Sequence, residues 1–130
     1  MHVQGFNHVT INISNLTNSL KFYVEVLGME LVHQGKKDAY LEWGSAWICL
    51  QEREQYPNKL VEQLSVDHVA FSISEDHFDA AVNILNDNEV IIVRGPIKRG
   101  TGWAINFLDP DGTQLELHTS TLADRMKVSF

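Results

Sequence analysis

The same alternation of polar and apolar residues occurs twice along the chain. Asn7 to Ile13 reads NHVTINI, and Asp67 to Ile73 reads DHVAFSI. In both segments every second residue is apolar, which is typical of a β-strand with one buried face. Because a histidine stands at the same place in each copy, the sequence predicts two related strands that each carry one imidazole on the face away from the apolar core.

Each strand is followed by apolar residues at helical spacing, which predict one helix per copy. In the first copy these residues are Leu16, Leu20, Tyr23 and Leu27, and Gly28 is expected to end the helix. In the second copy they are Phe78, Ala81, Val82 and Leu85, and Asn88 is expected to take the left-handed conformation that ends many helices.

Short strand-like segments complete each copy. They are residues 29–34, 39–43 and 46–51 in the first, and 90–95, 102–108 and 114–119 in the second, where the turn DPDG at 109–112 joins the last two strands. The fold class is therefore α+β with an internal duplication, built from two tandem βαβββ modules at about residues 4–52 and 64–121. We expect residues 1–130 to form one domain, with two curved mixed sheets around a cleft and the polar stretch 52–63 between the modules.

Charge and composition exclude several classes of protein. The formal net charge is −7 and no run of Lys and Arg is long enough to bind nucleic acid. No apolar run is long enough to span a bilayer, and the first residues lack the apolar core of a signal peptide. The single cysteine, Cys49, is expected to be a reduced packing residue. These observations predict a cytoplasmic protein.

Two histidines and a carboxylate are expected on the concave faces of the predicted sheets. Strand alternation places His8, His68 and Glu116 on these faces, and this set is typical of a divalent metal site with open positions. A lone strand histidine is more often a hydrogen-bonded structural residue, but its recurrence in both copies favours metal binding. His118 lies on the same face one pleat beyond Glu116 and is a weaker candidate ligand.

The duplicated module, with its two histidines and the ending FLDPDGTQLELH, resembles the vicinal oxygen chelate superfamily over residues 5–126. The segments GKKDAYLEWGSAWICL and LDPDGTQLELHTSTLADRM are most similar to its metal-dependent fosfomycin-resistance group. The resemblance implies an enzyme that opens the epoxide of fosfomycin with a thiol, of the glutathione or bacillithiol type, or with water. It also implies a domain-swapped homodimer.

The resemblance implies roles for individual residues. It assigns metal ligation to His8, His68 and Glu116, with His8 coming from the partner chain, and it implies Mn(II), although Fe(II), Ni(II) or Zn(II) would fit the same ligands. Thr10 matches a hydrogen-bonding or proton-relay position beside the epoxide oxygen. The positions expected to contact the substrate are Arg125, Tyr40, Trp47, Asn106 and Lys98.

Residues 94–106 differ from the resembled group. Pro96 replaces a lysine that binds the phosphonate, so Arg94, Lys98 or Arg99 is expected to take its role, while Asn106 replaces a tyrosine. The potassium-binding residues of the glutathione-using type are missing, so potassium is not expected. Two alternatives stay open. One is a glyoxalase-like or dioxygenase-like metalloenzyme with another chelating substrate, and the other is a protein that sequesters a small molecule without turnover.

Overall fold

The computed structural model describes residues 1–54 and 64–127 of the chain. These residues form two compact units, one on each side of the segment 55–63. Most of the polar stretch that the sequence places between the modules therefore lies outside the described residues. No helix in the described part of the chain is long and apolar enough to cross a membrane.

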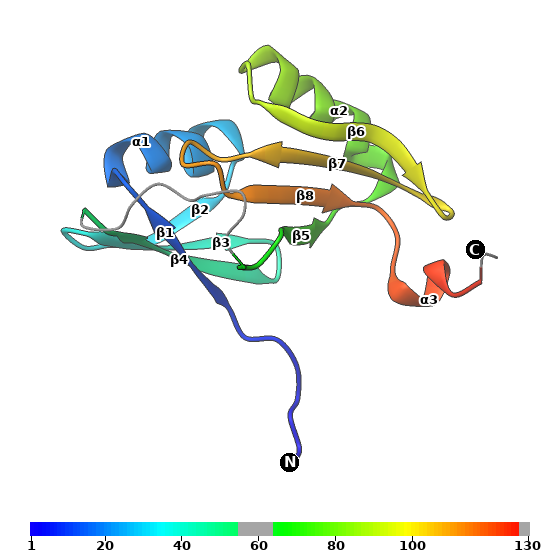
Figure 1. The fold of residues 1–130 in the computed structure, drawn as a ribbon, viewed down its shortest axis with the longest axis horizontal. Helices are drawn as coiled ribbons and strands as arrows, with labels where there is room; N and C mark the ends of the chain where they lie inside the picture. Colours follow the sequence, from blue (N-terminus) through cyan, green and yellow to red (C-terminus); the bar gives the residue numbers. More distant parts are fainter. Residues whose placement is uncertain (55–63, 128–130) are drawn as a thin grey trace. The chain divides into compact units, whose positions relative to one another are not determined.

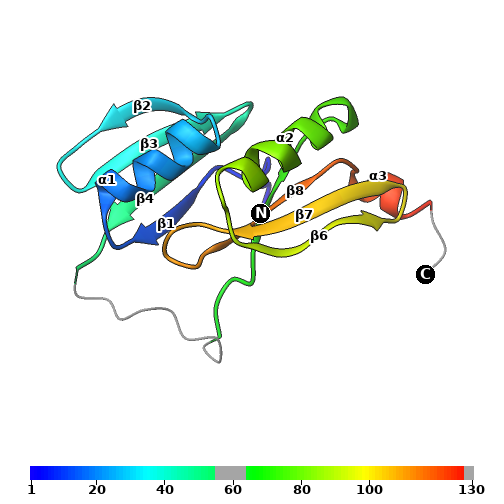
Figure 2. The same cartoon turned by 90° about the horizontal axis from the view of Figure 1, so that it is seen from above.

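The first unit is a four-stranded mixed sheet covered by one helical segment (Figures 1 and 2). Its strand order is β1-β4-β3-β2, with β1 parallel to β4 and the other pairs antiparallel. The strands are β1 (Val9–Ile13), β2 (Glu30–Gln34), β3 (Asp38–Trp43) and β4 (Ala46–Glu52). The strand expected from the first His-Val repeat is confirmed, and His8 directly precedes it.

The first helical segment differs from the expected regular α-helix. It begins as α1 (Leu16–Leu20) and continues as the π-helix η1 (Lys21–Val26). The wider π turn shifts which side chains face the sheet. The buried residues are therefore Leu16, Ser19, Phe22 and Tyr23, whereas the predicted stripe included Leu20 and Leu27. Gly28 ends the segment at a φ of 79°, as expected.

The second unit repeats this topology with the strand order β5-β8-β7-β6, in which only β5 and β8 are parallel. The strands are β5 (Val69–Ser72), β6 (Ile92–Arg99), β7 (Gly102–Leu108) and β8 (Gln114–His118), and the helices are α2 (Glu75–Asp87) and α3 (Leu122–Arg125). The shared topology confirms the α+β class and the tandem βαβββ modules.

The sequence predicts the backbone conformation at two turns of the second unit, the DPDG turn and the end of α2. Between β7 and β8, Asp109 Oδ1 accepts hydrogen bonds from the backbone N–H groups of Asp111 and Thr113, and Gly112 has a φ of 86°. The expected DPDG turn is therefore confirmed. After α2, the prediction for Asn88 is wrong. Asn88 has a φ of −97° and its side chain donates to the Ile84 carbonyl, while Glu89 takes the left-handed conformation at 57°.

Each sheet has one apolar face and one polar face. In β1, Ile11 and Ile13 are buried whereas Thr10 and Asn12 are exposed. In the second unit, α2 packs Phe78, Val82 and Leu85 against the apolar face of its sheet. The helix and the core therefore occupy one side of each sheet, and the opposite side is left for polar groups.

Candidate functional site

Two of the predicted metal ligands lie side by side in the second unit. His68 directly precedes β5 and Glu116 is in the middle of β8, and the parallel pairing of Ala70 with Glu116 brings the strands into register. His68 Nε2 lies 3.5 Å from Glu116 Oε1. The Glu116 side chain is only 9% exposed, whereas that of His68 is 34% exposed, so a buried carboxylate faces an accessible imidazole nitrogen.

Both predicted histidines are held through the same ring atom by the residue before them. His68 Nδ1 lies 2.7 Å from Asp67 Oδ2, and His8 Nδ1 lies 2.6 Å from Asn7 Oδ1. Carboxylate and amide oxygens accept hydrogen bonds, so the proton of each neutral imidazole is on Nδ1. The Nε2 lone pairs are therefore available as ligands. This arrangement is the usual way in which metal-binding histidines are oriented.

The distance between His68 and Glu116 fits a shared cation. A metal that lies about 2.1 Å from each of two ligand atoms leaves those atoms roughly 3.0 to 3.5 Å apart. With the proton of His68 on Nδ1, its Nε2 lone pair and the carboxylate oxygen both carry negative potential. The 3.5 Å gap is also long for a hydrogen bond between them. These two donors therefore fit a divalent cation such as Mn(II), Fe(II), Ni(II) or Zn(II).

A buried asparagine supports the Glu116 carboxylate. Asn106 in β7 pairs with Glu116 in β8, and its Nδ2 donates to Glu116 Oε1 at 2.9 Å and to Gln114 Oε1 at 3.1 Å. The Asn106 side chain is completely buried, and its Oδ1 has no hydrogen-bond partner. Both amide protons are therefore committed to neighbouring oxygens, and one of them fixes the orientation of the carboxylate.

The first unit places His8 among aromatic side chains that the sequence assigned to substrate binding. The rings of His8 and Trp47 stack at 4.1 Å between centroids, with an interplanar angle of 21°. Tyr40 meets Trp47 edge to face at 5.7 Å. The stacking restrains the plane of the His8 ring, so that its Nδ1 bond and its stacking partner together define the direction of Nε2.

Thr10 lies next to Cys49 on the polar face of the first sheet. The two residues are paired across β1 and β4. Burial raises the pKa of the Cys49 thiol, and a hydrogen bond with Thr10 acts in the opposite direction. A thiol with a raised pKa stays protonated near neutral pH and is a poor nucleophile. The half-buried Cys49 is therefore a poor nucleophile, and its packing role stays a prediction.

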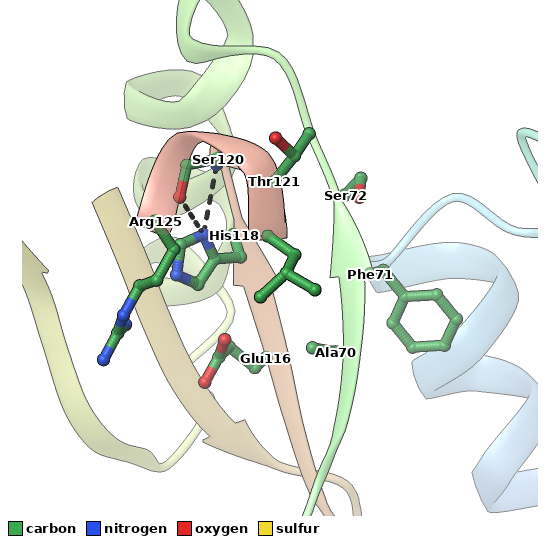
Figure 3. A pocket seen from close by; sticks show the side chains of 9 residues that line it. Ala70, Phe71, Ser72, Glu116, His118, Ser120, Thr121 and Arg125 are labelled. Carbon is green, nitrogen blue, oxygen red and sulfur yellow. Dashed lines mark hydrogen bonds between the residues drawn. The ribbon is translucent and has the colours of Figure 1, made fainter. Parts of the chain in front are cut away.

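A pocket of about 370 Å³ opens beside Glu116 in the second unit, and Figure 3 shows the side chains around it. Arg125, the predicted anion-binding residue, lines this pocket together with Glu116 and His118. The other lining residues are Ala70, Phe71, Ser72, Ser120, Thr121 and Leu122. The pocket thus combines one cation, one carboxylate and several hydrogen-bonding groups within a single unit.

The position of Arg125 is set by the start of α3. Thr121 Oγ1 accepts from the Asp124 backbone N–H, and Asp124 Oδ2 accepts from the Thr121 backbone N–H, which is a capping box. The hydrogen bond that the Asp124 carboxylate accepts from the Thr121 backbone, together with one from the Thr121 side chain, holds the pKa of Asp124 below its usual range. Arg125 is the next residue, so the cap anchors the turn that directs it to the pocket.

The basic residues of β6 do not all point to the same face. Arg94 pairs with Asn106, and Asn106 shares a face with Glu116, so Arg94 is on the polar face of the sheet. Lys98 pairs with Trp103, which strand alternation places on the opposite face from Asn106. Arg94 is therefore better placed than Lys98 to reach the Glu116 face. The substrate role of either residue stays a prediction.

The structure brings together part of the predicted set within each unit. His68, Glu116 and Arg125 belong to the second unit, and His8, Thr10, Tyr40 and Trp47 belong to the first. Among residues 1–54 and 64–127, no three His, Cys, Asp or Glu side chains form a group that could hold a metal ion. The three-ligand set with His8 therefore stays a prediction.

Comparison with known proteins identifies the family. The model of the glyoxalase/bleomycin resistance protein/dioxygenase superfamily matches residues 5–117. A metallothiol transferase FosB of Staphylococcus epidermidis is 38% identical over 128 residues, which cover 98% of this chain and 89% of that protein. The FosB of Lysinibacillus sphaericus is 37% identical over 127 residues, with coverages of 97% and 89%. The chain therefore belongs to this superfamily.

Solved structures show the same fold. The fosfomycin resistance protein FosX of Listeria monocytogenes, in a complex with Mn(II) and sulfate, matches with a TM-score of 0.79 at 24% identity, covering 97% of this chain and 98% of that one. FosX of Mesorhizobium loti matches with a TM-score of 0.77 at 24% identity, covering 96% and 99%. At this identity the likeness establishes the fold, and the tandem modules are those of the vicinal oxygen chelate superfamily.

Proposed function

We propose that this protein is a divalent-metal-dependent transferase that inactivates fosfomycin by adding a thiol to its epoxide. The observation that carries the proposal is the His68–Glu116 pair, which lies beside a pocket that also contains Arg125. Relatives that are named metallothiol transferases match nearly the whole chain at 36–38% identity, which supports transfer of a thiol. A protein that only sequesters its ligand would not need a carboxylate and an imidazole poised for a cation.

The proposed metal ligands are His8, His68 and Glu116, and the expected metal is Mn(II). We propose a homodimer in which His8 of one chain completes the site formed by His68 and Glu116 of the other. Three ligands leave open coordination positions for a substrate. A bound divalent cation supplies a Lewis acid that stabilises the oxyanion formed when an epoxide opens.

The reaction forms a bond from the thiol sulfur to an epoxide carbon and breaks the carbon–oxygen bond of that carbon. The ring oxygen stays on the neighbouring carbon as an alkoxide and takes up the proton that the thiol gives up. In the proposal, Thr10 donates a hydrogen bond to this oxygen or relays the proton. The nucleophile is an external thiol, glutathione or bacillithiol, because Cys49 is protonated and inert.

The other side chains of the proposed site bind and orient the substrate. Arg125 is the proposed ligand for the phosphonate, since its planar guanidinium can bind two anionic oxygens at once. Tyr40 and Trp47 provide an apolar wall on the His8 side. Arg94, which lies on the same face as Glu116, adds positive charge, and the buried Asn106 orients the Glu116 carboxylate. Together these groups would bind a small dianion in a protein whose net charge is −7.

The test is phosphorus NMR of fosfomycin incubated with the Mn(II)-loaded protein. Parallel samples contain glutathione, bacillithiol, cysteine or no thiol, and a further sample contains metal-free protein with a chelator. A new phosphonate signal is expected in at least one of the thiol samples, and the thiol in that sample is the nucleophile. Product without a thiol would indicate water as the nucleophile. Unchanged fosfomycin with metal bound would refute the proposal and favour a glyoxalase-like or dioxygenase-like enzyme with another chelating substrate.

Asn106→Leu is expected to lower Mn(II) affinity by about 10 to 100-fold, the usual cost of removing a residue that orients a metal ligand. The substitution removes the 2.9 Å hydrogen bond to Glu116 Oε1. It also leaves the buried Glu116 carboxylate without this donor, so the thermal midpoint of unfolding is expected to fall. Electron paramagnetic resonance titration of free Mn(II) measures the affinity, and calorimetry measures the midpoint.

Gln114→Leu is the matched control for this prediction. Gln114 accepts the other hydrogen bond of Asn106 Nδ2, at 3.1 Å, and its substitution leaves the bond to Glu116 in place. The control is expected to bind Mn(II) within about threefold of the unaltered protein, since no ligand loses its partner. Equal affinity for the Asn106→Leu variant would show that Asn106 does not support the metal site.

A further inference from the structure

His118 occupies the pocket between the proposed metal ligand and Arg125. It is two residues beyond Glu116 in β8, so strand alternation puts both side chains on the same face of the sheet. Its ring is half-buried and lines the pocket together with Arg125 (Figure 3). In the neighbouring strand β7, His118 pairs with Ala104, whose methyl group cannot form a hydrogen bond with the imidazole ring.

The tautomer of His118 is fixed by the backbone that follows it. The Ser120 backbone N–H donates to His118 Nδ1 at 3.1 Å, and Ser120 Oγ lies 3.2 Å from the same atom. A backbone N–H can only donate, so Nδ1 carries no proton. The proton of the neutral ring is therefore on Nε2, which Figure 3 shows directed away from Ser120. This tautomer is opposite to that of His68, whose Nδ1 donates to Asp67.

The segment that fixes the ring is itself anchored to β7. The Thr119 backbone N–H donates to the Trp103 carbonyl at 3.0 Å, and the Trp103 backbone N–H donates to Thr119 Oγ1 at 2.9 Å. Gly102 lies directly beneath, where an added Cβ would be 2.7 Å from Ser120 Cβ. Residues 119 and 120 are therefore held against the strand, and the donor to His118 Nδ1 has little freedom to move.

We propose that the His118 Nε2–H is a second donor of the substrate pocket and binds, together with Arg125, an anionic oxygen of a substrate. This inference rests on the proposed function. The oxygen belongs either to the phosphonate of fosfomycin or to a carboxylate of the thiol cosubstrate. Arg125 can bind two oxygens of a dianion, and a neutral donor fixed by Ser120 adds a third, directed contact without further positive charge.

The chemistry of the neighbouring side chains assigns this task to His118. Asn106, in the same sheet, has both amide protons committed to Glu116 and Gln114. Thr121 Oγ1 accepts from the Asp124 backbone N–H and caps α3. Ring nitrogen Nε2 of His118 therefore provides a fixed donor next to Arg125, whereas the hydroxyl groups of the lining serines can rotate.

The test compares His118→Leu with His118→Gln in the Mn(II)-loaded protein. Leucine removes the donor, while the glutamine amide restores an N–H near the place of Nε2. Loss of a hydrogen bond to an anion is expected to raise the KM for one substrate about 10 to 100-fold in the leucine variant. Glutamine is expected to recover much of this loss, and the KM of the other substrate and the affinity for Mn(II) are expected to stay unchanged.

The substrate whose KM rises carries the oxygen that His118 binds. A raised KM for fosfomycin alone assigns the phosphonate, and a raised KM for the thiol alone assigns its carboxylate. Unchanged KM values for both, or a loss of Mn(II) binding, would overturn the inference. The matched control is His77→Leu, because His77 is exposed in α2 and its Nδ1 also lies near a serine hydroxyl, 2.9 Å from Ser74 Oγ.

A second measurement separates this inference from the proposed function. Binding of fosfomycin and of inorganic phosphate is measured by calorimetry with the same Mn(II)-loaded variants. If the unaltered protein binds phosphate but does not turn over fosfomycin, the proposed function fails. Weaker phosphate binding by the leucine variant would then still support His118 as an anion donor, and equal phosphate binding would refute it.

Discussion

Glu116→Gln is expected to lower the affinity for Mn(II) by more than about 100-fold and to abolish measurable turnover of fosfomycin. Removal of a residue that only orients a ligand costs about 10 to 100-fold in metal affinity, and this substitution removes the negative charge of a proposed ligand itself. Glutamine has nearly the same shape, and its Oε1 can still accept from Asn106 Nδ2. The fold is therefore expected to remain intact while the metal is lost.

Two measurements check this prediction. Mn(II) affinity is obtained by titration with detection of the free ion, and fosfomycin consumption is followed by phosphorus NMR. Glu25→Gln removes the same charge from an exposed position of η1 and serves as the control. A Glu116→Gln variant that retains metal affinity within about threefold would show that Glu116 is not a ligand. A variant that unfolds would be replaced by Glu116→Asp, which keeps the charge but shortens the reach of the side chain.

The part of the site that follows from strand alternation could be predicted from the sequence. Alternation is a local property, so it placed Thr10 opposite the buried Ile11 and placed Glu116 on the polar face of its strand. The pairing of the strand after His68 with the last strand, β5 with β8, joins distant residues and was not predicted from alternation. Their parallel register brings His68 next to Glu116.

The interactions that support the site depend on contacts between distant residues, and the sequence pattern does not contain them. Asn106 was expected at the substrate, but the pairing of β7 with β8 buries it completely and directs its Nδ2 to Glu116. His118 was considered only as a weaker metal ligand, since it lies one pleat beyond Glu116. Its tautomer depends on the backbone of Ser120, which the sequence pattern does not show. Its position two residues after Glu116, with Ser120 two residues further on, was the one available signal.

Local conformation was harder to predict where side chains compete with the backbone. The amide of Asn88 hydrogen-bonds to the Ile84 carbonyl, so that residue stays near the helical region and the left-handed conformation passes to Glu89. In the first helical segment, apolar residues at both Phe22 and Tyr23 are buried by a π turn, which periodicity of 3.6 residues does not anticipate.

Mixed dimers of two inactive variants are expected to recover about half of the activity of the unaltered dimer, if each site is shared between chains. One chain carries His8→Ala and the other carries Glu116→Gln. In the mixed dimer, one site combines both substitutions, while the other combines the intact His8 of one chain with the intact His68 and Glu116 of its partner. Each variant alone lacks a ligand in both sites and is expected to be inactive.

Different affinity tags on the two chains allow the mixed dimer to be isolated by sequential purification, and phosphorus NMR measures its turnover. The reciprocal control pairs an unaltered chain with one that carries both substitutions. Shared sites leave this control inactive, because each of its sites lacks one ligand. Sites built within single chains reverse the result, since the control then keeps one complete site and the mixed dimer keeps none. Chains that fail to co-purify would contradict the homodimer, because the two tags can then never be recovered in one species.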